Sequence, residues 1–354
     1  MSRLRIGTRW IGEGEPCYVV AELSGNHNQS FERAVELIKA AKLAGADAVK
    51  LQTYTPDTLT IDCDREWFRI PEESLWGGKT LHQLYAEAHT PWEWQPKLQE
   101  VAVDLGIDLF STPFDSTAIE FLERMRVPAY KVASFEIVDV GLLERIGRIG
   151  KPVIVSTGMA SLSEIEQAMT TLRRAGAREI ALLKCTSAYP ASPDSMNLRT
   201  IPHLATTFGV TAGLSDHTLG WSVAVAAVTL GASIVEKHFT LRRADGGPDA
   251  AFSMEPEEFA AMVVAIRQVE QALGRVRYEQ TEEENQNICF RRSLFVVLDV
   301  KAGEPFTEKN VRSIRPGYGL PPVCLQDVLG KKAACDIALG TPLTWDVVAR
   351  GGRA

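Results

Sequence analysis

The chain has 354 residues, 45% of them hydrophobic and 23% charged, which is enough to bury a large core, or a large core and a small one. A net charge of −7 and an isoelectric point near 5.5 argue against a broad nucleic-acid surface, and we expect no such partner. The sequence contains no apolar run of 18 residues and no signal-peptide core at its start. We therefore expect a cytoplasmic protein with no membrane partner and with free cysteine thiols.

Eight short apolar runs divide the first three quarters of the chain, and helical patterns separate most of them. The helical segments 31–45 and 162–176 have apolar residues at a spacing near 3.6, and each ends in a glycine that suits a helix C-cap. This alternation predicts an α/β fold, a (β/α)8 TIM barrel, and a doubly wound open sheet is the less regular alternative. The predicted strands are 17–22, 47–53, 108–113, 129–134, 152–157, 180–185, 210–217 and 233–240.

One interval breaks this spacing, because residues 54–107 are too long for a single crossover helix. We interpret 54–90 as an excursion over the top of the barrel and 91–105 as the helix that returns to it. The interval contains four tryptophans, which either pack the excursion down or line a substrate pocket: Trp67, Trp76, Trp92 and Trp94.

The last quarter of the chain has a different organisation. A helical segment at 256–274 precedes a polar stretch at 280–287 that is typical of a linker. Beyond it, residues 298–311 repeat the pattern of 335–348, with aspartate, glycine, proline and threonine at matching positions, which predicts a small, pseudo-symmetric, β-rich domain. The predicted boundaries are 1–279 for the barrel, 280–289 for the linker and 290–354 for the small domain.

Two histidines end neighbouring strands late in the predicted barrel. His217 closes one strand and His238 the next, with a helical stretch between them. Parallel strands joined by a crossover helix are usually adjacent, so both imidazoles can reach one point. Each histidine alone is equally consistent with a buried core residue, but the pair, with Glu236 on the same face as His238, favours metal ligation. Because no cysteine ligand is nearby, we expect an octahedral ion completed by water and substrate oxygens.

Polar side chains also end most of the other predicted strands, at the face where TIM barrels carry their active sites. Lys50 and Lys131 come from nearby strands, and hydroxyl groups lie at four further strand ends. Ammonium groups beside directed hydroxyl donors are typical of a site for phosphate and carboxylate groups. The glycine-rich loop 246–249 either closes over the substrate or is a plain turn. The other candidates are Glu22, Thr112, Ser134, Ser156, Ser187, Tyr189, Ser215 and Glu236.

A series of strand-end motifs makes the chain similar to the sialic acid synthase family along essentially its full length. In chain order they are AELSGNHN, KLQTY, STPFD, YKVAS, STGMA, KCTSAYP, GLSDHT, VEKHFT and GGPD. The tail motifs RSLFVV and SIRPGYG resemble that family's C-terminal antifreeze-like (SAF) domain. The resemblance implies that phosphoenolpyruvate condenses with an open-chain acylamino sugar to give a nine-carbon 2-keto acid and phosphate. It also implies Mn²⁺ or Mg²⁺ and no organic cofactor.

The same resemblance assigns roles to individual residues. It implies that His217 and His238 are the metal ligands and that Glu22 is the carboxylate near the reacting aldehyde. Tyr189 and Asp249 fall on sugar-contacting positions. The phosphoenolpyruvate contacts that it implies are Lys50, Thr112, Lys131, Ser134 and Ser156, with Ser187 and Ser215 nearby and Glu236 as a further substrate-binding candidate.

Arg315 resembles the arginine that the SAF domain inserts into the active site of a partner subunit. The resemblance therefore implies a homodimer in which each C-terminal domain covers the partner's barrel. Ser187 stands where N-acetylneuraminate synthases usually have asparagine. Together with the sequences of residues 26–29, 50–58 and 314–322, this serine makes the chain most similar to the pseudaminic acid branch. That branch uses 2,4-diacetamido-2,4,6-trideoxy-L-altrose.

Other functions remain as alternatives. An N-acetylneuraminate or legionaminate synthase would use a different sugar, and a metal-dependent barrel aldolase would not release phosphate from phosphoenolpyruvate. The tail alone also suggests an ice- or carbohydrate-binding module. A scaffold barrel, however, has no need of two lysines and two histidines at its strand ends.

Overall fold

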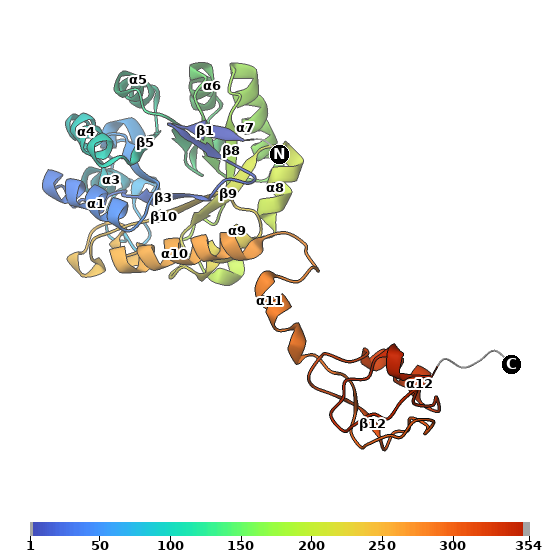
Figure 1. Ribbon diagram of the computed structural model, residues 1–354. Coiled ribbons are helices and arrows are strands. Elements are labelled where there is room, and N and C mark those ends of the chain that lie inside the picture. The colour runs from blue at the N-terminus through green and yellow to red at the C-terminus, as the bar shows by residue number, and fades with distance from the viewer. Residues whose placement is uncertain (1–2, 350–354) are drawn as a thin grey trace. The chain divides into compact units, whose positions relative to one another are not determined.

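The computed structural model describes residues 3–349, which form two compact units (Figure 1). The first unit ends at Gly274 and the second begins at Arg275, a few residues before the predicted end of the barrel at residue 279. The division follows directly after the last long helix of the first unit, α10 (Pro256–Leu273), where Gly274 is the C-cap residue. No helix among the described residues has both the length and the apolar character needed to cross a membrane.

The first unit is a closed barrel of eight parallel strands, which confirms the predicted TIM barrel and excludes the open sheet. The strands follow chain order around the barrel, and the last of them pairs with the first. Nearly every strand residue is buried, as expected for parallel strands covered on both faces. The strands are β3 (Tyr18–Glu22), β4 (Ala48–Thr53), β5 (Asp108–Pro113), β6 (Tyr130–Val132), β7 (Val153–Ser156), β8 (Ile180–Cys185), β9 (Thr211–Asp216) and β10 (Ile234–His238).

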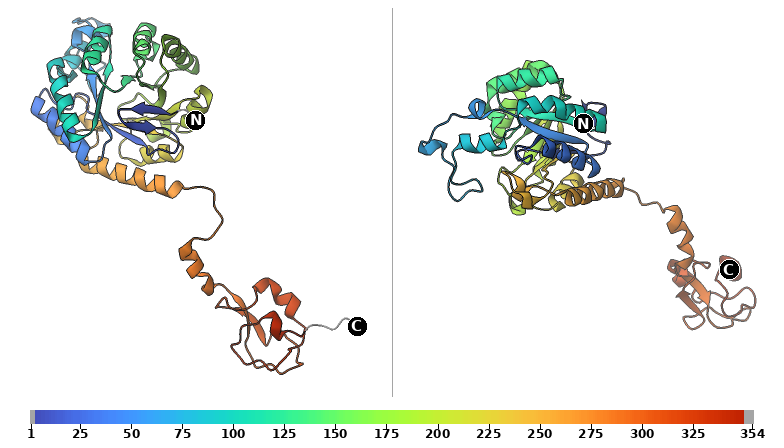
Figure 2. Two further views of the ribbon diagram at one scale, coloured as in Figure 1. Left: turned by 45° about the horizontal axis from the view of Figure 1, so that its top comes forward. Right: turned by 90° about the vertical axis from the view of Figure 1, so that its left-hand side faces the viewer.

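Helices surround the barrel on the outside, and the apolar core lies between them and the strands (Figures 1 and 2). Local signals set their ends. Ser161 caps one helix through a reciprocal pair with Glu164, and Gly106, Gly150 and Gly209 end three others in a left-handed conformation. Besides α10, these helices are α1 (Phe31–Leu43), α4 (Gln95–Leu105), α5 (Ser116–Met125), α6 (Val140–Ile149), α7 (Leu162–Ala175), α8 (Thr200–Phe208) and α9 (Ser222–Thr229).

A short N-terminal hairpin, which sequence analysis did not predict, closes the other end of the barrel. Strands β1 (Leu4–Ile6) and β2 (Arg9–Ile11) pair antiparallel, and their apolar side chains join the core inside the barrel. This core includes Tyr18 and Ile234, the first residues of β3 and β10, so the hairpin covers the amino ends of the strands. The strand ends that carry the candidate site are therefore the open face.

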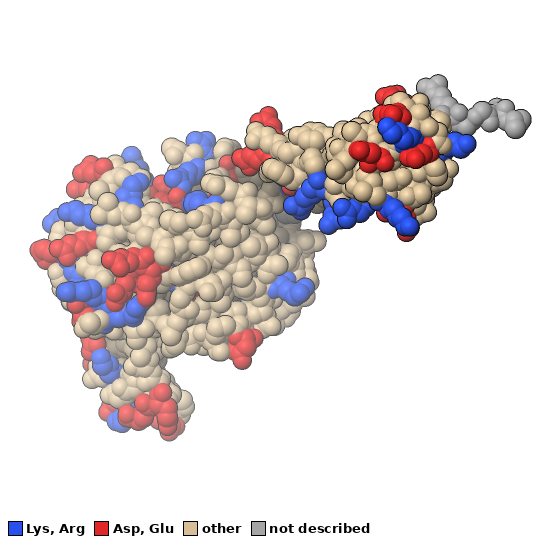
Figure 3. All heavy atoms as spheres, turned by 60° about the horizontal axis from the view of Figure 1, so that its bottom comes forward, with Lys and Arg blue, Asp and Glu red and all other residues tan. Residues whose placement is uncertain are grey.

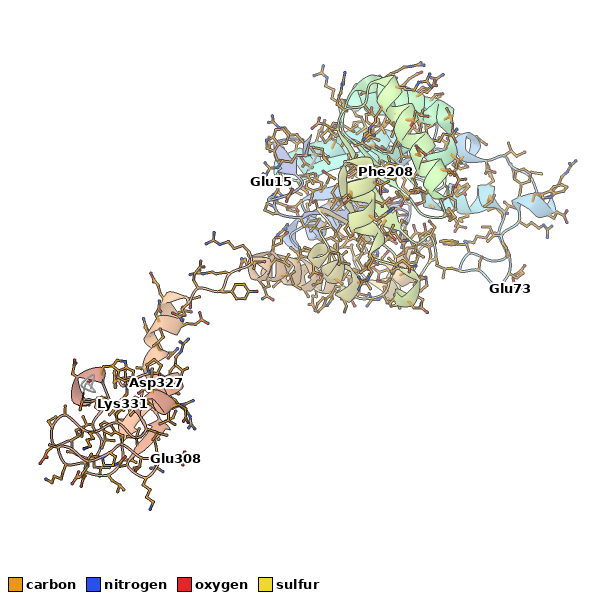
Figure 4. All side chains as sticks on the ribbon, turned by 90° about the vertical axis from the view of Figure 1, so that its right-hand side faces the viewer. Glu15, Glu73, Phe208, Glu308, Asp327 and Lys331 are labelled. Atoms are coloured by element: carbon orange, nitrogen blue, oxygen red, sulfur yellow. The ribbon has the colours of Figure 1, made fainter. Side chains whose placement is uncertain are left out.

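The long interval between β4 and β5 forms the expected excursion. It contains two helices, α2 (Pro56–Leu59) and α3 (Leu81–Ala88), and then returns through α4. Figure 4 shows the part around Glu73 projecting from the body of the barrel. Short 3-10 turns complete the described chain: η1 (Glu66–Phe68), η2 (Trp92–Trp94), η3 (Glu136–Val138), η4 (Pro193–Ser195), η5 (Arg243–Asp245), η6 (Ala250–Phe252), η7 (Ile288–Phe290), η8 (Pro322–Cys324) and η9 (Trp345–Val347).

The second unit is a small β-rich fold built on the repeat that the sequence predicted. Val300 and Ile337, which occupy equivalent positions of the two repeats, exchange both backbone hydrogen bonds, at 2.9 and 2.8 Å. Asp299 accepts the backbone N–H of Leu339 at 2.7 Å, and its equivalent Asp336 accepts that of Ala302 at 2.8 Å. The two repeats are therefore related by pseudo-two-fold symmetry.

The secondary structure of this unit is sparse. Strands β11 (Ser293–Val296) and β12 (Val311–Ile314) pair antiparallel, and the only α-helices described here are α11 (Glu282–Gln286) and α12 (Leu325–Val328). Helix α11 lies inside the stretch predicted to be a plain linker, because Thr281 caps it and Glu284 completes the reciprocal cap. Figure 3 shows Lys and Arg side chains gathered along one edge of this unit.

Candidate active site

Two lysines and two glutamates form a buried charged cluster at the carboxyl ends of the barrel strands. Lys50 Nζ lies 2.6 Å from Glu22 Oε2 and 3.4 Å from Glu236 Oε1. Lys131 Nζ lies 3.2 Å from the same oxygen of Glu236. The four residues come from β4, β6, β3 and β10, so the barrel brings together side chains that are far apart in the sequence. All four are buried, which is rare for charged side chains unless they are paired.

Burial and mutual charge set the protonation of this cluster. Burial raises the pKa of Glu22 although Lys50 opposes it. For Glu236 the burial effect is outweighed by Lys131 and Lys50, which hold its pKa below the ordinary value. Burial lowers the pKa of Lys131, whereas the two carboxylates outweigh burial at Lys50 and raise its pKa. The pKa values of the two buried carboxyl groups are thus shifted in opposite directions.

Hydroxyl groups on β5, β9 and β7 lie at the same ends of the barrel strands. Thr112 Oγ1 accepts a hydrogen bond from Lys50 at 3.2 Å, and Ser215 Oγ lies 3.5 Å from Glu236. The Oγ of Ser156 is buried without a hydrogen-bond partner in the described structure. Such a group is costly unless a ligand satisfies it.

Gly158, which follows β7, brings two further serines together. A Cβ at this position would lie 2.2 Å from Ser187 Oγ and 2.7 Å from Ser134 Oγ, so only glycine fits. Ser134 Oγ accepts the Gly158 N–H at 3.1 Å. The structure thus joins Lys50 to Thr112 and places Ser134 and Ser187 on either side of Gly158, all at the carboxyl ends of the strands, where Ser156 also lies.

The two histidines stand side by side, with ring centroids 5.4 Å apart. His217 Nδ1 lies 3.0 Å from the backbone oxygen of Thr186, an arrangement that leaves Nε2 available to a metal. His238 Nδ1 is buried and has no hydrogen-bond partner among the described residues. No group of three His, Cys, Asp or Glu within residues 3–349 is arranged to hold a metal. The residues thus fit an ion that takes two imidazoles from the protein and oxygen ligands from water and substrate.

Aromatic and polar side chains form the side of the pocket next to the histidines. The Tyr189 ring lies 4.4 Å from His217, and the Phe252 ring lies 4.8 Å from His238. Asp249 is hydrogen-bonded to Ser24, and burial raises the pKa of its carboxyl group.

Gln52 connects the Ser24–Asp249 pair to the charged cluster. Its Nε2 donates to Glu22 at 2.9 Å and to Ser24 at 3.2 Å. The predicted sugar contacts Tyr189 and Asp249 therefore lie on the Glu22 and histidine side of the pocket.

Two residues near the site were missed by sequence analysis. Cys185 Sγ lies 3.9 Å from both His217 Nδ1 and Ser187 Oγ; burial would raise its pKa, but His217 lowers it to about 7. Glu136 lies in the turn after β6, and burial raises its pKa to about 7. Trp76 was named as one of four tryptophans of the interval 54–107 that either pack the excursion down or line a substrate pocket. Its contact with Tyr189 depends on how that excursion folds, so no local pattern could have revealed it.

The opposite end of the barrel also has a hollow, of about 1340 Å³, but its charges satisfy one another. Arg267 lies 3.0 Å from Asp47 and 3.0 Å from Glu270, and Arg9 also pairs with Asp47. Polar groups at the amino ends of barrel strands usually serve stability. Arg315 belongs to the second unit, where it is exposed directly after β12.

Comparison with known proteins identifies the family. Residues 37–278 match the NeuB family, and residues 291–349 match the SAF domain. The chain belongs to the NeuB family. It is 46% identical to the pseudaminic acid synthase of Campylobacter jejuni subsp. jejuni serotype O:23/36, over 92% of this chain and 95% of that protein. The corresponding enzyme of Helicobacter pylori is 44% identical, over 95% and 99%.

A solved structure supports the same assignment. The N-acetylneuraminic acid synthetase of Leptospira borgpetersenii superposes with a TM-score of 0.71 at 31% identity, covering 81% of this chain and 95% of that one. The resemblance to the sialic acid synthase family that the motifs indicated is thus confirmed. The chain is an enzyme of this family, with a TIM barrel followed by a SAF domain.

Proposed function

We propose that this enzyme is a pseudaminic acid synthase. It condenses phosphoenolpyruvate with 2,4-diacetamido-2,4,6-trideoxy-L-altrose and releases phosphate. One observation carries the proposal: a buried pocket of two lysines, hydroxyl groups and two histidines lies in a chain 44–46% identical to curated pseudaminic acid synthases. The related N,N'-diacetyllegionaminic acid synthase of Legionella pneumophila is less similar, at 35% identity.

The anionic substrate fits the cationic part of the pocket. Lys50 and Lys131 supply positive charge, while Ser156 Oγ offers an unused hydrogen-bonding group to a phosphate or carboxylate oxygen. Preorganised donors in a dry pocket orient phosphoenolpyruvate without further reorganisation. Its C3 would then face the histidine and Tyr189 side of the pocket, where the sugar aldehyde binds.

His217 and His238 would hold a divalent ion, Mn²⁺ or Mg²⁺, which when bound supplies Lewis-acid polarisation of the aldehyde oxygen. C3 of phosphoenolpyruvate forms a bond to the aldehyde carbon, and positive charge develops at C2. Water adds to C2 and loses one proton. The C–O bond to phosphate then breaks, and the remaining proton of the C2 hydroxyl group goes to the departing phosphate, which leaves the 2-keto group. We propose that Glu22, whose pKa is raised by burial, gives a proton to the aldehyde oxygen and regains one from that water; a water on the ion is the alternative proton carrier.

A phosphate-release assay tests this function directly. The purified enzyme, phosphoenolpyruvate and each candidate sugar are combined with chelator, with Mn²⁺ and with Mg²⁺. We expect phosphate only when an ion is present, and faster release with the diacetamido sugar than with N-acetylmannosamine. Full activity after thorough chelation would reject the two-histidine metal site. Faster turnover of N-acetylmannosamine would move the enzyme to the neuraminate branch, and a 2-keto product without phosphate release would indicate an aldolase.

We further propose a cytoplasmic homodimer in which the SAF domain of each subunit covers the barrel of the other. The support is chemical: Arg315 is exposed at the end of β12, and arginine is suited to binding carbonyl or carboxylate groups with several hydrogen bonds. A closed pair of subunits with reciprocal exchange satisfies two-fold symmetry.

A further inference from the structure

Trp76 links the excursion to the loop that contains Asp249. Its indole Nε1 donates a hydrogen bond of 2.7 Å to the backbone oxygen of Pro248, the residue before Asp249. Its ring lies 5.7 Å from the Tyr189 ring, at an angle of 57°. Trp76 remains partly exposed, so part of the ring is free to contact a ligand.

Trp76 is the outermost member of a continuous aromatic wall that begins at the two histidines. Tyr189 contacts His217 with its ring tilted by 44°, and the rings of Tyr189 and Phe252 lie 5.2 Å apart. Phe252 in turn contacts His238. These rings adjoin the two histidines, next to which we place the sugar.

The backbone on both sides of the Trp76 contact is fixed. A Cβ at Gly77 would lie 2.4 Å from the backbone oxygen of Glu72, so this turn requires glycine directly after the tryptophan. On the other side, Gly247 has a φ of +120°, and Asn28 Nδ2 donates to the Gly246 oxygen at 3.1 Å. The indole is therefore held at a defined position rather than on a freely moving loop.

We propose that Trp76 is a specificity-determining residue that packs its ring against the methyl group at carbon 6 of the sugar. The inference rests on the proposed function and extends it. Because the indole N–H is already bonded to Pro248, the ring offers a substrate only its apolar surface. A 6-deoxy sugar presents a methyl group there, whereas N-acetylmannosamine presents a hydroxymethyl group that would lose hydrogen bonds to water.

The test compares Trp76→Ala and Trp76→Phe with Trp67→Ala, which removes a tryptophan of the same excursion that is 73% exposed. KM for each substrate and the thermal midpoint are measured for all variants. We expect Trp76→Ala to raise KM for the diacetamido sugar at least about tenfold and to reduce its preference over N-acetylmannosamine. That tenfold increase corresponds to about 1.4 kcal/mol of lost contact. KM for phosphoenolpyruvate should change less than about twofold. Trp76→Phe should recover most of the loss, and Trp67→Ala should behave as wild type.

Several outcomes would overturn the inference. Equal increases in both KM values with a lower thermal midpoint would show a structural role. A Trp76→Phe enzyme as impaired as Trp76→Ala would show that the bond to Pro248, and not ring contact, is what matters. If the wild type prefers N-acetylmannosamine, the proposed substrate fails, and methyl recognition fails with it. An unchanged KM for the diacetamido sugar in a wild type that does use it would reject Trp76 alone.

Discussion

Lys131 and Lys237 are both buried ammonium groups, but they face opposite sides of the barrel wall. Lys131 points into the pocket beside Glu236. Lys237, the next residue after Glu236, points away and pairs with Asp216 at 2.7 Å and with the Thr218 oxygen at 2.6 Å. The alternation of side chains along a strand explains the difference. Lys131 is therefore available to a substrate, whereas Lys237 stabilises the fold through its ion pair.

This contrast yields a prediction with an internal control. Lys131→Met should lower kcat/KM for phosphoenolpyruvate more than about tenfold, because a charge-assisted hydrogen bond contributes about 1.5–3 kcal/mol. Lys237→Met should instead lower the free energy of unfolding by about 3–5 kcal/mol, since it leaves Asp216 buried and unpaired. Phosphate-release kinetics and urea denaturation measure the two effects. Similar kinetics in the two variants would show that Lys131 does not bind the substrate.

The raised pKa of Glu136 predicts that the stability of the protein depends on pH. Its pKa is raised by burial to about 7 in the folded protein, against an ordinary value of 4.5. Between these values the folded state binds more protons than the unfolded state, so stability falls as pH rises towards 7. Glu136→Gln should therefore be more stable than wild type at pH 8, with the difference shrinking towards pH 5. Thermal midpoints at the two pH values measure this, and a pH-independent difference would mean that Glu136 is not the titrating group.

At the residue scale, the sequence alone predicted which candidate residues lie together, wherever their position follows from the barrel. The carboxyl ends of barrel strands converge, so the strand pattern was enough to group Lys50, Lys131, His217 and His238. The side-chain period also placed Glu236 with His238. Cys185 and Glu136 were missed because their roles depend on which neighbours are within a few ångströms, and strand periodicity carries no such information.

At the scale of elements, the N-terminal hairpin closes the end of the barrel that is remote from the candidate site. Ile6 is fully buried in the barrel core. Ile6→Ala should lower the free energy of unfolding by about 2–5 kcal/mol through loss of packing and the cavity that remains. KM for phosphoenolpyruvate should not change, because the hairpin packs at the amino ends of the strands.

Trp10→Ala is the matched control for the hairpin, because that side chain is 52% exposed and its ring contacts only Arg5 among the described cation–aromatic pairs. Its cost should stay below about 1 kcal/mol. Urea denaturation of both variants gives the comparison. If Trp10→Ala lowered the free energy of unfolding as much as Ile6→Ala, surface contacts rather than core residues would hold the hairpin on the barrel.

The elements themselves differed in how well the sequence predicted them. All eight barrel strands lie within the predicted runs, because each is a buried apolar segment bounded by a helical pattern. The hairpin strands β1 and β2 were not predicted, since three residues are too few to show a period of two. Helix α11 was missed for the opposite reason. Its polar composition resembles a linker, and only its reciprocal cap of Thr281 and Glu284 indicates a helix.

At the scale of the whole molecule, the chain divides into a barrel that contains the buried cluster of lysines and glutamates and a small unit that contains Arg315. The small unit has its own apolar core, in which Phe306 and Leu343 occupy equivalent positions of the two repeats. This core makes the small unit a compact body, with Arg315 exposed on its surface.

Two inactive variants should restore activity to each other if Arg315 acts across the dimer. In a mixed dimer of Arg315→Ala and His217→Ala subunits, one barrel has both histidines and receives an intact Arg315 from its partner. One of the two sites in such a dimer is then complete, so it should recover up to about half of wild-type activity. Phosphate release after subunit exchange measures this, and native mass spectrometry establishes that mixed dimers are present. If Arg315 serves its own barrel, each chain of the mixed dimer lacks one essential group, and proven mixed dimers will stay inactive.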